Sequence, residues 1–471
     1  MDEQNNSREN QLVFRTPKER ALRLLLKIPH SSNPLSSVLL LGYGFILIIL
    51  LGTILLALPV SSASGQWTHP VDALFTATSA VSVTGLAVVD TGTYWNTSGQ
   101  LIILVLIQIG GLGFIIGATF LLLAIGGRFG LKERLVISES MGLDQLGGVL
   151  GIVTKVALFV FLTEAAGAVI LYIHWVSAGN TANPGLAAVF HTVSAFNNCG
   201  MDIFGNFSSL SAYRGDAVVL LVTALLILSG STGYYVLADI AGHRRFSKLS
   251  FESKIVLTVT GSILVLGTLF YMVAEYSVPE TLGPLSFPQK LMGAFFQSVA
   301  NRTAGFSTFD IGALSQLSLF ATIFQMYIGG AAGSVAGGVK VNTFGVLAIT
   351  VISLIRGKDN IEAFGRQLTR QTVYRALTLL MLYLGAAGIF VTLLSITEIF
   401  PLEELLFETF SALGTVGLST GITPDLSYAG RFIIIVTMFI GRLGPLALMA
   451  FLVRRKQPTV IEYPYEPIRL G

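Results

Sequence analysis

Four short stretches of this chain of 471 residues repeat one another without a gap, and this repeat limits the fold more than composition does. Each stretch begins with a phenylalanine and reaches a glycine ten residues later. The stretches read FTATSAVSVTGL (75–86), FHTVSAFNNCGM (190–201), FFQSVANRTAGF (295–306) and FETFSALGTVGL (407–418). Four copies of one pattern predict four similar structural units.

A proline precedes each of the four glycines by a nearly constant distance. Pro70, Pro184, Pro288 and Pro401 lie 15, 16, 17 and 16 residues before their glycines. Proline is favoured at the first position of a helix, where its missing N–H costs nothing. Each unit therefore predicts a short helix opened by proline, followed by an extended strand that ends at glycine.

The composition indicates an integral membrane protein. The chain is 53% hydrophobic and only 12% charged, whereas soluble proteins carry about 25% charged residues. Apolar runs long enough for a helix to cross a bilayer lie near 36–59, 99–125, 149–175, 216–240, 253–275, 317–355, 373–398 and 430–453. Each repeated stretch lies between two members of a pair of runs and is too short to span, which is typical of a re-entrant segment.

These observations predict an all-α integral membrane fold with eight transmembrane helices and four re-entrant pore loops around one central pore. Each repeat (M1–P–M2) has an outer helix, a pore helix with its strand, and an inner helix. The predicted parts are an N-terminal tail (1–35), repeat 1 (36–125), repeat 2 (149–240), repeat 3 with a broken inner helix (253–355), repeat 4 (373–455) and a C-terminal tail (456–471).

The distribution of lysine and arginine predicts the orientation. These residues gather in the segments 8–27, 126–134, 243–254, 356–370 and 454–456, which alternate with the loops that carry the repeated stretches. The positive-inside rule places both termini in the cytoplasm and lets the four stretches enter from outside. A secondary transporter of inverted repeats is disfavoured because all four repeats share one orientation. The net charge of +3 gives no indication of nucleic-acid binding.

The four strands have the composition of a cation filter. Backbone carbonyls can replace the hydration shell of a monovalent cation where irregular backbone lines a cavity. Glycine permits the alternating backbone conformations that such a filter needs, and the negative ends of the pore helices favour cations. The predicted filter residues are Val83, Thr84, Gly85, Asn198, Cys199, Gly200, Thr303, Ala304, Gly305, Thr415, Val416 and Gly417.

Four aspartates follow the filter glycines within eight residues: Asp90, Asp202, Asp310 and Asp425. They have two interpretations, an acidic outer mouth that concentrates cations or ordinary loop aspartates at a water interface. The single cysteine, Cys199, excludes an intrachain disulfide, and its place in the second filter favours a backbone role.

The sixth apolar run contains the segment GGAAGSVAGGVK, residues 329–340, which we call the glycine-rich loop. Its glycines cost about 1 kcal/mol each inside a helix, so the helix should break here, beside a cavity or buried in protein. The glycines could instead permit close helix packing. A nucleotide-binding P-loop is a poor match, because a valine separates Gly338 from Lys340.

Two charges interrupt apolar runs. Arg442 lies 25 residues after Gly417, and a charge at such depth either faces a cavity or a partner or extends to the cytoplasmic surface. The same alternatives hold for Lys340. Glu164 is predicted to pair with a cation or to face water.

The repeats, the four glycines and the glycine-rich loop resemble the Trk/Ktr/HKT superfamily of potassium transporters, from about residue 36 onward. The Ktr membrane subunits are the closest match, since only a short charged tail precedes the first run. The resemblance implies potassium rather than sodium, because all four filter positions are glycine. It also implies looser selectivity, because the second and third filters depart from Thr-Val-Gly.

The resemblance further implies a gate below the filter, in which Arg442 acts as an electropositive barrier. The gate residues carried over are Gly329, Gly330, Gly333, Ser334, Gly337, Gly338, Lys340 and Arg442. It also implies a homodimer in the plasma membrane, regulated by a cytoplasmic RCK-domain nucleotide-binding ring (KtrA-like). The basic loops suit either such a partner or lipid headgroups.

The predicted function is potassium uptake, with K⁺, and Na⁺ if the flux is coupled to it, as transported ions and no bound cofactor. Sodium-coupled and channel-like flux both stay open, and a sodium-permeable channel of the same fold is the alternative. An enzyme is disfavoured. Residues 417–421 formally fit G-x-S-x-G, but they overlap the fourth filter, and no H-E-x-x-H motif occurs.

Overall fold

The computed structural model describes residues 34–113, 149–179, 181, 183–358 and 360–452. These residues are mainly helical, with one short antiparallel hairpin of β1 (Glu362–Ala363) and β2 (Arg366–Gln367). The α-helices are α2 (Pro34–Ala57), α3 (Pro70–Ser82), α4 (Thr97–Leu112), α7 (Val149–Ala178), α8 (Pro184–Phe196), α9 (Ala217–Ser231), α10 (Tyr234–Gly242), α11 (Phe251–Ala274), α12 (Phe287–Ala300), α13 (Gln316–Tyr327), α14 (Val341–Ile355), α15 (Arg370–Thr397), α16 (Leu402–Gly414) and α17 (Tyr428–Leu452).

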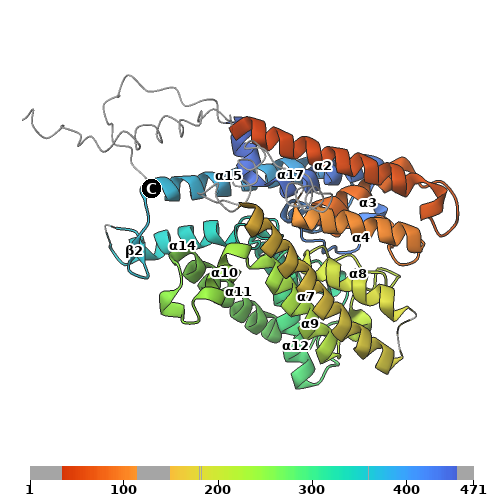
Figure 1. The fold of residues 1–471 in the computed structure, drawn as a ribbon, viewed down its shortest axis with the longest axis horizontal. Helices are drawn as coiled ribbons and strands as arrows, with labels where there is room; N and C mark the ends of the chain where they lie inside the picture. The colour runs from red at the N-terminus through yellow and green to blue at the C-terminus, as the bar shows by residue number, and fades with distance from the viewer. Residues whose placement is uncertain (1–33, 114–148, 180, 182, 359, 453–471) are drawn as a thin grey trace, which may run out of the picture.

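The four short helices α3, α8, α12 and α16 each follow a long helix and pack against it. Phe75, Phe190 and Phe407 are fully buried in these helices, whereas in α12 the fully buried ring is that of Phe296 and Phe295 is only partly buried. The last helix, α17, packs on α2 and α3 (Figure 1). The last described helix therefore packs against the first two.

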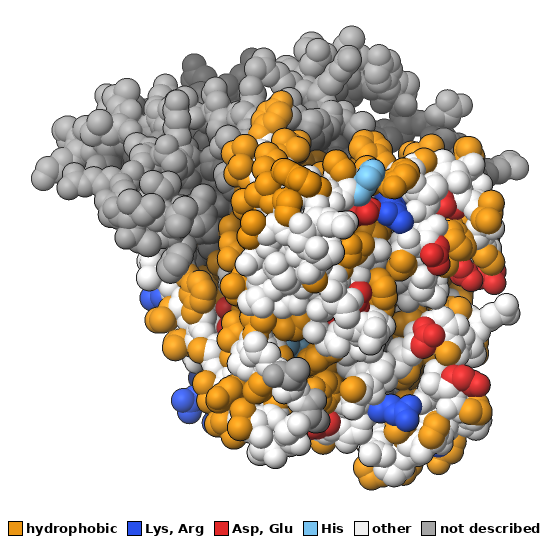
Figure 2. All heavy atoms as spheres, turned by 90° about the vertical axis from the view of Figure 1, so that its right-hand side faces the viewer, with side chains coloured by type: hydrophobic (Ala, Val, Ile, Leu, Met, Phe, Trp, Pro, Cys, Tyr) orange, Lys and Arg blue, Asp and Glu red, His pale blue; other side chains and the backbone are white. Residues whose placement is uncertain are grey.

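Several helices have the length and surface of membrane spans. Within the described residues, three are long and apolar enough to cross a bilayer: Val153–Ala178, Phe251–Ala274 and Arg370–Thr397. The bent pair α9 and α10 also passes when it is taken together. Hydrophobic side chains cover much of the face in Figure 2, and large apolar residues such as Leu162, Leu269 and Ile396 are exposed. Such surfaces suit contact with lipid.

The prolines mark the starts of the short helices to within one residue. Pro70 and Pro184 are the first residues of α3 and α8. Pro288 is the second residue of α12, because Ser286 and Gln289 form a capping box that starts this helix one residue earlier. Pro401 lies just before α16, and its carbonyl accepts the N–H groups of Glu404 and Leu405 in the first turn of the helix. The prediction of proline at the first helical position is thus wrong by one residue for these two helices.

Acceptors on the outer helices hold the starts of the next inner helices. Glu275, at the end of α11, accepts the hydroxyl of Ser315 at 2.8 Å, and Ser315 caps α13. Glu398, at the end of α15, accepts the hydroxyl of Ser427 just before α17. Such side chains satisfy backbone N–H groups that a helix start leaves unpaired. In the third and fourth repeats the outer helix therefore helps to fix the start of the inner helix.

Several helices break or end within the described residues. α9 and α10 are bent by 100° around Gly233, which has φ 86°, whereas the sequence predicted one continuous run over 216–240. α13 and α14 are separated by residues 328–340. α17 is non-helical at Gly444 (φ 78°). α4 ends at Leu112, and the rest of the predicted run 99–125 lies outside the described residues.

An ion pair joins α3, in the first repeat, to α17, in the fourth. Arg431 of α17 donates from Nη1 to Asp72 of α3 at 2.6 Å, from Nε to the carbonyl of Leu426 and from Nη2 to that of Pro424. The side chains of Arg431 and Asp72 are only 16% and 15% exposed. A partly buried pair with additional hydrogen bonds holds its geometry better than a surface pair.

We expect Asp72→Asn to lower the free energy of unfolding by about 1.5–3 kcal/mol, the usual contribution of a hydrogen bond to a charged group. The measurement is the thermal midpoint of the purified protein in detergent. Glu362→Gln is the matched control, because Lys358 and Glu362 form a pair with side chains 45% and 47% exposed, for which about 0.3–0.5 kcal/mol is typical. Equal shifts in the two variants would contradict a role for Asp72 in closing the chain.

Candidate functional site

The four short helices end in one recurring backbone conformation. Two residues before each filter glycine the chain is left-handed, at Val83 (φ 55°), Asn198 (57°), Thr303 (63°) and Thr415 (49°). The glycines that follow also have positive φ, at Gly85 (94°), Gly200 (80°), Gly305 (73°) and Gly417 (94°). A left-handed conformation is unusual for residues such as valine and threonine. Its fourfold recurrence indicates a constrained functional site.

Backbone N–H groups in these strands are bonded back toward the helices. Thr84, Cys199 and Val416 each donate to the carbonyl of a serine five residues earlier, at 2.8 Å. The hydroxyl oxygens of Ser79 and Ser411 also accept the N–H groups of Gly85 and Gly417 at 3.0 and 3.1 Å. The N–H groups are thereby engaged on the side of the helices, which leaves carbonyl oxygens for the opposite side.

The four strands meet in a closed ring. A Cβ atom placed on any filter glycine would lie within 3.0 Å of a carbonyl oxygen on the next strand. The pairs are Gly85 with Cys199, Gly200 with Ala304, Gly305 with Val416 and Gly417 with Thr84. The order is cyclic, so the predicted filter residues of all four stretches come together. Only glycine fits at these four positions without displacing a carbonyl.

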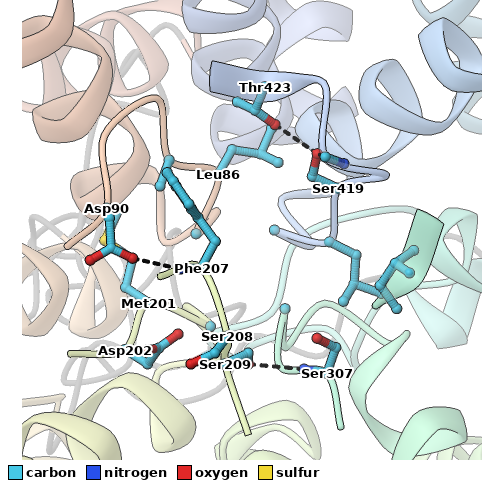
Figure 3. Close-up of a pocket in the computed structure, with 18 of the residues that line it drawn as sticks. Leu86, Asp90, Met201, Asp202, Phe207, Ser208, Ser209, Ser307, Ser419 and Thr423 are labelled. Carbon is cyan, nitrogen blue, oxygen red and sulfur yellow. Dashed lines mark hydrogen bonds between the residues drawn. The ribbon is translucent and has the colours of Figure 1, made fainter. Parts of the chain in front are cut away.

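A cavity of about 470 Å³ is lined by the four filter glycines and by residues that follow them in the sequence (Figure 3). It is lined by all four strands, with Leu86 and Asp90 from the first, Asp202 from the second, Ser307 from the third and Ser419 from the fourth. Figure 3 shows these side chains around one opening, where Asp90 accepts the N–H of Phe207 at 2.6 Å.

The four aspartates differ in what they can do. Asp90, Asp202 and Asp310 line the cavity, but Asp425 does not, because its 3-10 turn places Thr423 and Pro424 there instead. Asp90 also accepts both the N–H and the hydroxyl of Thr93, so it acts as a loop aspartate. Burial raises the pKa of Asp202 to about 7, and nearby Asp90 raises it too, although the N–H of Phe204 opposes the shift. The acidic mouth therefore has three members at most.

The glycine-rich loop lies against the ring, where Gly337 contacts Gly414 and Thr415. The N–H of Gly329 donates to the carbonyl of Val339 at 2.9 Å, so the two ends of the loop are adjacent. Between them, Ala331 and Val335 donate to the carbonyls of Ser231 and Gly230 at the end of α9. These bonds attach the loop to the end of α9, the inner helix of the second repeat.

Close packing explains most glycines of the loop. A Cβ atom on Gly337 would collide with the hydroxyl of Thr415 at the inner end of the fourth strand. Gly329, Gly330 and Gly338 are also in close contact, whereas Gly333 has open space around it and φ 69°. The packing interpretation and the broken-helix interpretation therefore both apply, because the close contacts are made by a non-helical segment.

Arg442 is partly buried and is bonded to backbone carbonyls of other segments. Its guanidinium donates to the carbonyls of Val335, Gly110 and Gly111, which belong to the glycine-rich loop and to the end of α4. Lys340 donates to the carbonyl of Ala336 at 2.5 Å. Both cations are bonded to carbonyls of the loop.

Among the residues that the structure describes, Glu164 is bonded to an amide, that of Asn197. Asn197, next to the second filter, donates from Nδ2 to Glu164 at 3.1 Å and to Gln108 at 3.2 Å. Cys199 is fully buried, and its carbonyl lies against Gly85. Over the described ranges, no group of three or more His, Cys, Asp or Glu side chains could hold a metal ion.

Sequence reasoning missed the side chains that support the strands from behind. Ser79 and Ser411 bind filter N–H groups, and Glu408 accepts the hydroxyls of Ser419 and Thr423 in the outer loop. The serines had a signal, since Ser79, Ser194 and Ser411 occupy one column of the aligned stretches. Glu408 had none, because its column holds four different residue types.

Comparison with known proteins identifies the family. Residues 37–462 match the model of TrkH, a cation transport protein. Ktr system potassium uptake protein B of Bacillus subtilis is 42% identical, over 90% of this chain and 94% of the relative. Potassium/sodium uptake protein NtpJ of Enterococcus hirae is 39% identical, over 93% of this chain and 98% of the relative.

The fold has a solved counterpart. The potassium transporter TrkH from Vibrio parahaemolyticus superposes with a TM-score of 0.71 at 18% identity, over 90% of this chain and 86% of that chain. At this identity the likeness concerns the fold alone. Together with the family match and the apolar helices, it leads to one conclusion: the chain is a membrane protein of the TrkH family of cation transport proteins and not an enzyme.

Proposed function

We propose that this chain is the pore subunit of a potassium-uptake system. K⁺ enters the outer cavity, loses water to the carbonyls of the four-strand ring, and passes the glycine-rich loop on the inner side. The observation that carries the proposal is the cyclic contact of the four filter glycines with the carbonyls of their neighbours. A closed ring of carbonyl-bearing strands can coordinate a cation from all sides.

The proposal includes the architecture predicted from the sequence. Eight transmembrane helices and four re-entrant loops would form four repeats, over 36–125, 149–240, 253–355 and 373–455, with cytoplasmic tails at 1–35 and 456–471. The protein would lie in the plasma membrane as a homodimer, with both termini in the cytoplasm and an RCK-domain ring as regulator. The names of its Ktr relatives support a place in a multi-subunit system.

The glycine-rich loop, Lys340 and Arg442 form the proposed gate. The loop lies between the inner end of the fourth strand, at Thr415, and the end of α9. Arg442 joins it to α4. The loop is bonded to α9, α10 and α17 and lies against Thr415, so its displacement would open a path on this side of the ring.

Uptake of Rb⁺ or K⁺ by cells that lack their own potassium uptake tests the function, with and without external Na⁺. We expect uptake that K⁺ inhibits and that excess Na⁺ does not. Stimulation by Na⁺ would indicate coupling. The name of the Enterococcus relative favours a second candidate, a pore that also carries sodium, and strong inhibition by Na⁺ would support it. Absence of Rb⁺ uptake at full expression would contradict both.

Asp202 should make uptake depend on external pH. With a raised pKa of about 7, this carboxyl is neutral below that pH and charged above it, and its charge attracts cations into the cavity. We therefore expect Rb⁺ uptake at subsaturating concentration to fall as external pH is lowered through 7. Asp202→Asn should abolish this dependence, whereas Asp310→Asn should keep it. An unchanged pH profile in Asp202→Asn would contradict the assignment.

A further inference from the structure

Arg302 is a buried charge to which the proposed filter and gate assign no role. It directly precedes the filter residue Thr303, and its side chain is only 2% exposed. The matching positions of the other three stretches hold Ser82, Asn197 and Gly414, which are uncharged. The third stretch is thus the one that places a full positive charge at the inner end of the ring.

The guanidinium of Arg302 is poorly satisfied. Its Nη2 donates to the carbonyl of Gly329, at the start of the glycine-rich loop, over 3.4 Å. Its Nε and Nη1 have no hydrogen-bond partner among the described residues. Buried donors without partners, and buried charges without compensation, destabilise the arrangement that buries them. Arg442, in contrast, donates to three carbonyls on the same loop and on α4. With the loop in its present position, the hydrogen bonds of Arg442 are therefore better satisfied than those of Arg302.

The backbone next to Arg302 is held by a network of hydrogen bonds around Asn301. Asn301 donates to Tyr271 at 2.7 Å and to Gln325 at 2.9 Å, and it accepts from Gln297 at 2.7 Å. This fully buried network ties the end of α12 to α11 and α13. Displacement of the loop, which admits water, is the change that can satisfy the guanidinium.

We propose that Arg302 is a positioning residue of the transport cycle, which disfavours the present position of the glycine-rich loop and so promotes its displacement. The inference rests on the gate proposed above and deepens it, because it gives the two arginines opposite effects. Arg442 holds the loop in the path, and Arg302 favours its departure.

The test measures Rb⁺ uptake in Arg302→Gln and Arg302→Met, which remove the charge, and in Arg302→Lys, which keeps it. We expect roughly tenfold lower uptake in the neutral variants, the order expected from unmet hydrogen bonds of one charged group, and near-normal uptake with lysine. Lys290→Gln is the matched control. Lys290 lies in α12, the helix that ends just before Arg302, and it also donates to a carbonyl, that of Tyr276, but far from the loop along the sequence. It should leave uptake unchanged.

A deletion of residues 331–337 separates this inference from the gate itself. In that background the neutral Arg302 variants should have no further effect. A second readout is the rate at which a thiol reagent, added from the cytoplasmic side, modifies the cysteine of Ser334→Cys. The neutral Arg302 variants should slow this modification. The native Cys199 is buried. Higher uptake in Arg302→Gln, or an equal loss with and without residues 331–337, would overturn the inference. If the deletion itself fails to raise uptake, the proposed gate fails.

Discussion

Gly417→Ser is expected to lower Rb⁺ uptake by roughly 10- to 100-fold and to reduce the preference for K⁺ over Na⁺. Gly417 has φ 94° and would place a Cβ atom against the carbonyl oxygen of Thr84 and the Cα atom of Gly85. A side chain in such a conformation costs about 1–3 kcal/mol, and each 1.4 kcal/mol corresponds to about tenfold in an equilibrium. The measurement is Rb⁺ uptake and its inhibition by Na⁺ in uptake-deficient cells.

Gly421→Ala is the matched control for this prediction. Gly421 also has a positive φ, 105°, and also lines the outer cavity, but nothing lies within 4 Å of its Cβ position. It therefore reproduces the backbone strain without displacing a carbonyl. Equal losses in Gly417→Ser and Gly421→Ala would assign the effect to strain in the outer loop and would remove Gly417 from the filter.

The filter glycines could be predicted from the fourfold repeat. Aligned on Phe75, Phe190, Phe295 and Phe407, the stretches point to four equivalent glycines from residue spacing alone. Their arrangement in a ring is a tertiary property, yet four equivalent units on one chain have few other ways to bring their polar strands together within a bilayer. The family predicted from these residues is confirmed by the family model and the relatives.

The less predictable part consists of local conformations that residue preferences argue against. Val83 and Thr415 are β-branched, and such residues rarely adopt a left-handed conformation. The tertiary contacts of the ring override that preference. The bend between α9 and α10 depends on a single glycine, Gly233, and one glycine in an apolar run is usually tolerated in a helix. Here the carbonyl of Ala332 lies against Gly233, so the loop and the bend form together.

The partners of Arg442 could not be predicted from the sequence. Its depth in the last apolar run predicted a cavity or a partner, but its acceptors are backbone carbonyls more than 100 residues away, at Val335 and Gly110. Every residue has a carbonyl, so these acceptors leave no trace in the sequence. The same reason hid the contact of Arg302 with Gly329.

Arg442→Ala is expected to raise Rb⁺ uptake, because it leaves the carbonyl of Val335 without its donor and frees the glycine-rich loop from α4. A hydrogen bond to a charged group contributes about 1.5–3 kcal/mol, which corresponds to roughly 10- to 100-fold in the equilibrium between loop positions. Deletion of residues 331–337 should have the same effect, since Gly329 and Val339 are already adjacent and the shortened chain can close between them. The measurement is initial Rb⁺ uptake at matched expression.

Three further results decide between gating and packing. The combination of Arg442→Ala with the deletion should equal the deletion alone, because the arginine acts through the loop. Arg442→Lys should lie between wild type and Arg442→Ala, because an ammonium keeps the charge but lacks the planar fork that reaches several carbonyls. Inhibition by Na⁺ should stay as in wild type, because neither change touches the four filter glycines. Unchanged uptake in both Arg442→Ala and the deletion would return these residues to a packing role, and a loss of K⁺ preference would place Arg442 in the filter instead.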